Sequence, residues 1–115
     1  MQHRDRIVLK KIISEIDIGI EMLGETSLEV FLHDEMLRRA IGMTVINIGE
    51  LTKNVTSETR AAYPAVPWKE VAGFRDIAAH KYQTLRMEDV YLSVVEDFPA
   101  LKTQLVKILS QEASL

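Results

Sequence analysis

The sequence predicts an all-α fold, an antiparallel four-helix (up-and-down) bundle with an additional short helix. Apolar residues recur at alternating steps of three and four along most of the 115 residues, which is the spacing of helices with one buried face. Glycine and proline number only five and three, so helix-breaking positions are few. A chain of this length buries one core. We therefore expect residues 1–115 to form a single domain.

The first helix is expected from about Arg4 to Leu23, and Gly24 is a good C-terminal stop. Its apolar seam consists of Leu9, Ile13, Ile16, Ile20 and Leu23. Ile7, Ile12 and Ile18 lie off this seam and widen the apolar face. This pattern predicts that the helix is buried on more than one side.

A short helical stretch follows, which Thr26 or Ser27 can cap, with Glu29 supplying the capping-box carboxylate. A second long helix is then expected from about Asp34 to Lys53. Its apolar face consists of Leu37, Ile41, Val45, Ile48 and Leu51. Gly42 and Gly49 are seven residues apart and therefore on one side, where they would let another backbone approach closely.

The second half of the chain predicts two further helices after a short turn that Ser57 caps. The third helix is expected from Pro67 to about Lys81, because proline is favoured at a first helical position. Its inward-facing residues would be Trp68, Val71, Phe74 and Ile77 or Ala78. The fourth stretch runs from near Met87 to about Gln111, with a kink or a fresh start at Pro99. Its seam consists of Val94, Phe98, Leu101, Leu105 and Ile108.

Composition narrows the possible functions. There is no cysteine, hence no disulfide framework and no thiolate metal site, and no apolar run approaches the roughly 18 residues of a membrane span. The plain expectation is a soluble cytoplasmic protein with no membrane partner.

Glu29 and His33 are four residues apart and could bind a metal, but no Glu-x-x-His pair supports such a site, so no metal or cofactor is expected. A net charge of −3 argues against a general polyanion binder, although residues 60–86 are locally basic and suited to a phosphate-bearing ligand.

A polar cluster near the end of the third helix contains the candidate chemistry, from Arg75 and Asp76 to His80 and Tyr82. On a helix, Asp76 and His80 are neighbours and could hydrogen-bond, which would fix the imidazole tautomer. Arg75 and His80 are five apart, so they project about 140° from one another. One copy therefore struggles to direct both at one atom, whereas two copies facing each other across a dimer axis could do so.

The pattern Arg-x4-His-x-Tyr, formed by Arg75, His80 and Tyr82, resembles the signature of HepT toxins in the HEPN superfamily. The resemblance covers nearly the whole chain, because similar segments occur at the right intervals. These are Ile48-Gly49-Glu50, Pro67-Trp68, and Asp97-Phe98-Pro99-Ala100-Leu101-Lys102. Met43 and Ile46 depart from it, since relatives often carry charge there. The resemblance implies an HEPN-like bundle for residues 1–115.

The resemblance also implies a function. Arg75 and His80 would cleave RNA without a metal in a groove between two protomers, and Asp76 would orient His80 or the RNA. Tyr82 would be the residue to which a cognate nucleotidyltransferase antitoxin of the MntA type attaches AMP. The implied partners are a second copy of the chain, that antitoxin, and tRNA or mRNA as substrate.

Two other interpretations stay open. The chain could be a non-catalytic HEPN bundle that serves as a binding subunit for a nucleotidyltransferase, although the intact pair of Arg75 and His80 favours the enzyme. A plain helical scaffold would explain the apolar seams but not the polar cluster. Taken singly, each polar residue also has an ordinary role, with His80 as a helix cap, Asp76 as a surface carboxylate and Tyr82 as a packed ring.

Overall fold

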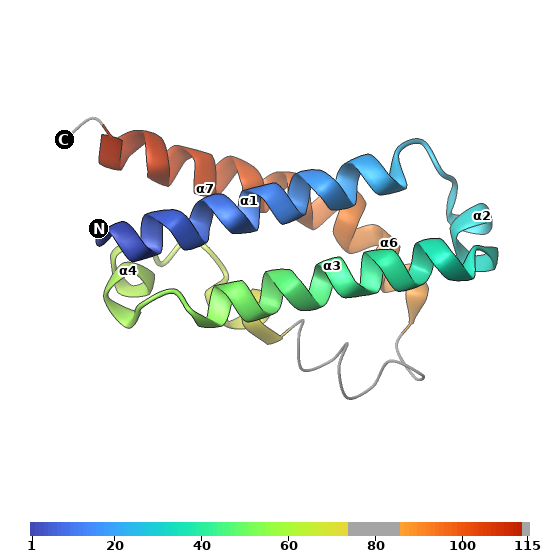
Figure 1. Ribbon diagram of the computed structural model, residues 1–115, viewed down its shortest axis with the longest axis horizontal. Coiled ribbons are helices and arrows are strands. Elements are labelled where there is room, and N and C mark those ends of the chain that lie inside the picture. Colours follow the sequence, from blue (N-terminus) through green and yellow to red (C-terminus); the bar gives the residue numbers. More distant parts are fainter. Residues whose placement is uncertain (74–85, 114–115) are drawn as a thin grey trace.

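The computed structural model describes residues 1–73 and 86–113 of the 115-residue chain. Every regular element in these parts is helical, which confirms the predicted all-α class (Figure 1). Three long helices are α1 (His3–Leu23), α3 (Glu35–Lys53) and α7 (Phe98–Ala113). The shorter elements are α2 (Leu28–His33), α4 (Ser57–Ala62), α6 (Met87–Leu92), the π-helical turn η1 (Ser93–Asp97) and the helical residues 68–73.

Helix α1 lies between α3 and α7 and runs antiparallel to both (Figure 1). The two chain ends consequently lie at the same end of the molecule, where the α-amino group of Met1 is 3.2 Å from Oε2 of Glu112. A single apolar core extends along this arrangement. Its fully buried side chains include Leu9, Ile12, Ile16, Phe31, Ile41, Ile48, Val94, Phe98 and Leu105.

The limits of α1 agree closely with the sequence prediction, but its buried face does not follow the predicted seam. Gly24 ends the helix with a φ of +53°, a conformation that favours glycine. Ile12 is buried as part of the wider face, and Ile13 is only half-buried. Ile20, Ile7 and Ile18 are exposed, so the prediction that these three side chains are buried is wrong. The reason is that α3 and α7 contact α1 along the stripe centred on Ile12 and Ile16, which leaves the opposite side uncovered.

Side-chain caps set the starts of the next helices. Ser27, one of the two predicted caps of α2, accepts a hydrogen bond from the backbone N–H of Val30 at 3.2 Å. Asp34 caps α3 by accepting a hydrogen bond from the N–H of Leu37 at 2.9 Å. The apolar face of α3 is inward as predicted, because Ile41, Val45 and Ile48 are buried and Leu37 and Leu51 are partly buried.

The prediction that Ser57 caps this turn is wrong, because Ser57 is the first helical residue of α4 and the residue before it is the cap. Thr56 is the N-cap, and its hydroxyl accepts a hydrogen bond from the N–H of Thr59 at 3.3 Å. The same hydroxyl donates to the carboxylate of Asp5 in the first turn of α1, at 2.5 Å. This contact across the fold holds the Thr56 side chain in the capping position, and it is invisible in the local sequence.

The predicted break near Pro99 takes the form of a π-helical turn. The N–H of Phe98 donates to the carbonyl of Ser93, five residues earlier, and α7 begins at Phe98. Proline has no N–H to offer an interior helical bond, so the regular pattern is interrupted beside it. The five predicted seam residues are all buried, and the helix extends to Ala113.

Candidate functional site

The four predicted site residues, Arg75, Asp76, His80 and Tyr82, all lie in residues 74–85, outside the residues that the structure describes. The inward-facing positions predicted for Phe74, Ile77 and Ala78 lie there as well. The structure does describe the two elements that flank this segment, which are the helical residues 68–73 and α6.

The element before the segment is fixed to the core by Trp68. Its indole N–H donates to the carbonyl of Tyr63 at 2.9 Å, and its side chain is buried. Val71 and Ala72 are buried beside it, and the N–H of Val71 donates to the carbonyl of Pro67 at 3.0 Å. The prediction that Trp68 and Val71 face the core is therefore confirmed. Trp68 is a core residue and is not available as a stacking platform for a nucleobase.

The element after the segment is held by Tyr91. Its hydroxyl donates to the carbonyl of Thr26 at 2.7 Å, and its ring lies 5.5 Å from that of Phe31, centroid to centroid. Val90 is buried on the same helix. At the start of α6, Arg86 is exposed, with its Nε 3.8 Å from a carboxylate oxygen of Glu88. Residues 74–85 thus connect two helices that are each packed on the bundle.

Two of the three tyrosines have hydroxyl groups that are already engaged. Besides Tyr91, Tyr63 donates a hydrogen bond to the carboxylate of Glu112. This hydrogen bond is the main cause that raises the pKa of Tyr63 above its ordinary value, with burial and the charge of Glu112 acting in the same direction. A phenol that is hydrogen-bonded and kept protonated in this way is a poor nucleophile.

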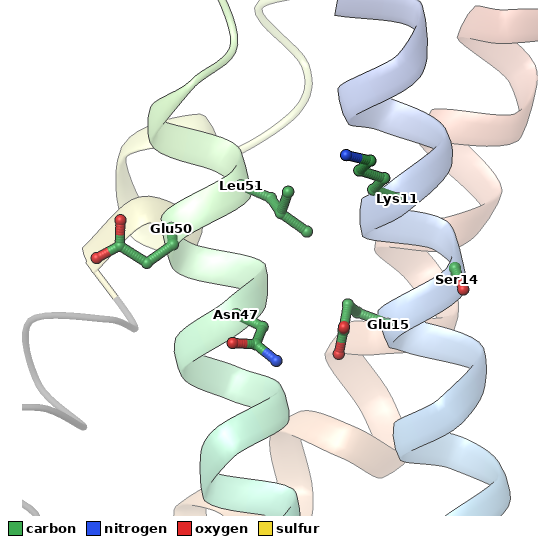
Figure 2. Close-up of a pocket in the computed structure, with 6 residues that line it drawn as sticks. All are labelled: Lys11, Ser14, Glu15, Asn47, Glu50 and Leu51. Atoms are coloured by element: carbon green, nitrogen blue, oxygen red, sulfur yellow. The ribbon is translucent and has the colours of Figure 1, made fainter.

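A shallow polar groove of about 340 Å³ lies between α1 and α3 (Figure 2). Figure 2 shows Lys11 and Glu15 on the side of α1 that faces α3, with Asn47 and Leu51 reaching toward them and Glu50 directed away from α1. Sequence reasoning missed this groove. The signal was present, because Lys11 and Ser14 lie opposite the buried stripe of α1 and mark its polar side.

The described residues offer no metal centre, since no group of three or more metal-binding side chains comes together among residues 1–73 and 86–113. The pair suggested by the sequence, Glu29 and His33, is not part of any such group in these ranges. Nδ1 of His33 lies 2.8 Å from the backbone carbonyl of Glu29, so the imidazole interacts with its own helix. None of the helices in the same described ranges is long and apolar enough to cross a membrane.

The comparisons with known proteins extend over the predicted site. The sequence model of the family described as "Ribonuclease HepT-like" matches residues 12–108, a range that includes Arg75 to Tyr82. The chain is 35% identical over 107 residues to "Putative RNase TTE0752" of Caldanaerobacter subterraneus subsp. tengcongensis, covering 93% of this chain and 96% of that protein. It is 31% identical over 106 residues to "Probable ribonuclease HepT" of Thermococcus cleftensis, covering 92% of this chain and 94% of that protein. No solved structure matches the chain. The family match and these two full-length relatives show that the chain belongs to the HepT-like ribonuclease family.

Proposed function

We propose that this protein is the ribonuclease toxin of a toxin–antitoxin pair and that it cleaves RNA without a metal ion. The observation that carries the proposal is the family match over residues 12–108, because it includes both the arginine and the histidine of the predicted site. The helices that precede and follow residues 74–85 are anchored to the rest of the bundle by hydrogen bonds of Trp68 and Tyr91.

The chemistry assigned to the site needs two groups. His80 removes the proton from a ribose 2′-hydroxyl, whose oxygen then attacks the adjacent phosphorus, or it supplies the proton that the departing 5′-oxygen takes up. Arg75 holds the phosphate with two parallel N–H donors and stabilises the charge that grows on its oxygens. Asp76 is a positioning residue that orients His80 or the RNA.

The site is composite in this proposal and forms between two copies of the chain. The reason is the splay of about 140° between Arg75 and His80 on a regular helix, which one protomer alone cannot direct at one phosphate. Light scattering should report at least twice the 13.1 kDa of the chain. A stable monomer that still cleaves RNA would contradict the composite site.

Control of the toxin is assigned to Tyr82, to which a nucleotidyltransferase antitoxin of the MntA type would attach AMP. The engagement of the Tyr63 hydroxyl with Glu112 and of the Tyr91 hydroxyl with Thr26 supports this choice, because modification of either would first break a hydrogen bond. Each AMP adds negative charge and bulk next to a groove that must admit RNA. The RNA substrate would be tRNA or mRNA.

The deciding experiment compares the wild-type protein with Arg75→Ala and His80→Ala on RNA in the presence of EDTA. The wild-type protein should cleave, and each variant should be slower by roughly 10²–10⁴-fold, the usual cost of losing a proton-transfer or charge-stabilising group. Arg86→Ala is the matched control, since Arg86 is exposed and near the segment but outside the proposed chemistry. A wild-type protein that binds the nucleotidyltransferase but never cleaves RNA would favour the non-catalytic alternative.

A further inference from the structure

Helix α1 has a second row of residues on the face opposite the core. Ile7, Lys11, Ser14 and Ile18 follow one another at steps of four, three and four. These steps are those of the seam positions in a coiled coil, where two helices pack side by side. All four residues are exposed, and the two isoleucines at the ends of the row are 40% and 44% exposed. The exposed face of α1 thus has the spacing of a helix-packing surface, and no partner covers it among residues 1–73 and 86–113.

The charges of α1 are divided between its two halves. Apart from the buried Asp5, the N-terminal half is basic and the C-terminal half is acidic. The basic residues are Arg4, Arg6, Lys10 and Lys11, and the acidic ones are Glu15, Asp17 and Glu21. This order opposes the helix dipole, which favours acidic residues at the N-terminus and basic ones at the C-terminus. The order of charges along α1 therefore does not stabilise this helix by itself.

Contacts within the chain use only part of this charge. Asp17 is paired with Lys102 at 2.6 Å, and Arg4 donates to the carbonyl of Asn54 at 3.2 Å. Among the described contacts, Lys10, Lys11, Glu15 and Glu21 make neither a hydrogen bond nor an ion pair. A partner that presents acidic groups to the first half of α1 and basic groups to the second half would complement both.

We propose that this partner is the α1 helix of a second copy of the chain, packed antiparallel about a two-fold axis that passes between Lys11 and Ser14. In this arrangement Ile7 of one copy packs against Ile18 of the other at both ends of the contact. Lys11 lies opposite Ser14 and close to Glu15 of the second copy. The basic half of each helix faces the acidic half of its mate, which is the isologous self-complementarity that a two-fold interface requires.

The groove between α1 and α3 lies beside the centre of this contact. It presents the carboxylate of Glu15 and the amide of Asn47 at its edge, as Figure 2 shows, and both suit the ammonium group of Lys11 from the second copy. Met43 of α3, which is 56% exposed, adds apolar surface. It adjoins Thr44, whose methyl group is 3.2 Å from where a Cβ on Gly19 would stand, so Met43 and Ile18 flank the same crossing of α1 and α3.

A second copy fits this face better than RNA, because the acidic half of α1 would repel a phosphate backbone. The face is separate in sequence from residues 75–82, and its assignment does not rest on the proposed ribonuclease activity. If the catalytic pairing also forms, the two kinds of contact together would build a tetramer or a larger assembly.

Cysteine cross-linking tests the arrangement directly, because the natural chain contains no cysteine. An Ile7→Cys protein and a tagged Ile18→Cys protein, mixed while reduced and then oxidised, should give a covalent dimer with one chain of each kind. Each protein alone should give little, since two copies of position 7 would lie about 16 Å apart along the helix axes. A disulfide needs Cα atoms within about 7 Å.

Mixing Ile18→Cys with Val106→Cys controls for random collision, because Val106 is similarly exposed (46%) but lies on α7. The two interfaces are distinguished because cross-linking reports the α1 contact whether or not the protein cleaves RNA. A mixture that cross-links no better than the separate proteins or the Val106→Cys control would overturn the proposal.

Charge reversal provides a second measurement in the same cross-linking mixture. Lys11→Glu alone should lower the affinity of the pairing by about tenfold, because like charges then meet twice across the axis. The double variant Lys11→Glu with Glu15→Lys keeps the net charge and restores opposite charges across the axis. Its cross-linking yield should return close to that of the unreversed mixture. A double variant no better than Lys11→Glu would contradict the antiparallel register.

Discussion

The hydroxyl of Thr59 donates a 2.6 Å hydrogen bond to the carboxylate of Asp5, across 54 positions of the sequence. The same carboxylate accepts bonds from the hydroxyl and the backbone N–H of Thr56, at 2.5 and 3.1 Å. These contacts fasten the first turn of α1 to α4. The chain then continues to Tyr63, whose carbonyl receives the indole N–H of Trp68. A buried carboxylate at the start of the protein is therefore connected, contact by contact, to the helical residues that precede the proposed catalytic segment.

Replacing Asp5 by asparagine should reduce the free energy of unfolding by roughly 2–3 kcal/mol. The change keeps the shape of the side chain but removes the charge that three donors share, and hydrogen bonds to charged groups are the stronger kind. Thermal unfolding followed by circular dichroism should show a midpoint lower by about 10 °C. Asp17→Asn is the matched control, because its pair with Lys102 is exposed and should contribute less than about 1 kcal/mol. Equal losses in the two variants would contradict the role given to Asp5.

The contribution of Asp5 to the free energy of unfolding should also depend on pH. Burial by itself raises the pKa of Asp5, but the hydrogen bonds from Thr56 and Thr59 together lower it more, so the net pKa lies below the ordinary value of 3.8. The folded protein therefore holds this proton less tightly than the unfolded chain. The stabilisation is complete above the unfolded pKa and is lost as the pH falls through the lowered folded value.

Urea unfolding at several pH values tests this expectation. The difference in unfolding free energy between the wild-type protein and Asp5→Asn should be constant between about pH 5 and 7 and should shrink below about pH 4. Taking the difference removes the contribution of Glu112, whose pKa is also lowered, chiefly by the Tyr63 hydroxyl. A difference that grows on acidification would show that the sign is wrong.

Two glycines should respond oppositely to substitution. A Cβ on Gly19 would stand 3.2 Å from the Thr44 methyl group and 3.5 Å from the ring of Phe98, so Gly19→Leu should overpack the crossing of three helices. We expect a loss of about 1–3 kcal/mol. A Cβ on Gly73 would meet nothing within 4 Å, and this residue is helical, so Gly73→Ala should stabilise the protein by about 0.5–1 kcal/mol. Chemical denaturation of both variants measures the two changes in the free energy of unfolding. Changes of the same sign and size would contradict this prediction.

Replacing Tyr82 by phenylalanine should preserve RNA cleavage and prevent control by the antitoxin. The ring remains, whereas the hydroxyl that would accept AMP is lost. Mass spectrometry of wild-type protein co-expressed with the nucleotidyltransferase should show increments of AMP on the tryptic peptide that ends at Arg86. Tyr63→Phe and Tyr91→Phe serve as controls and should be modified as fully as the wild-type protein. If the Tyr82→Phe variant is still fully modified, AMP is attached to a residue other than Tyr82.

Much of the helical architecture could be predicted from the sequence, because helix limits depend on neighbouring residues. Gly24 stops α1 where expected, since a positive φ suits a residue without a side chain. The seam from Val94 to Ile108 is buried throughout, because one periodic stripe has one possible inward face. The candidate site likewise came from a local pattern, Arg75 to Tyr82, and the family match over residues 12–108 shows that the chain belongs to a ribonuclease family.

Only the tertiary structure decided which parts of ambiguous patterns are buried. Isoleucines occur around most of α1, and the positions of α3 and α7 select Ile12 and Ile16 while leaving Ile7 and Ile18 exposed. The sequence shows Asp5 as one more charged residue in a first helical turn. Its burial depends on Thr56 and Thr59, more than 50 residues away, because a carboxylate can leave water only where enough donors converge on it. That convergence is a property of the packed helices, and no local spacing in the chain encodes it.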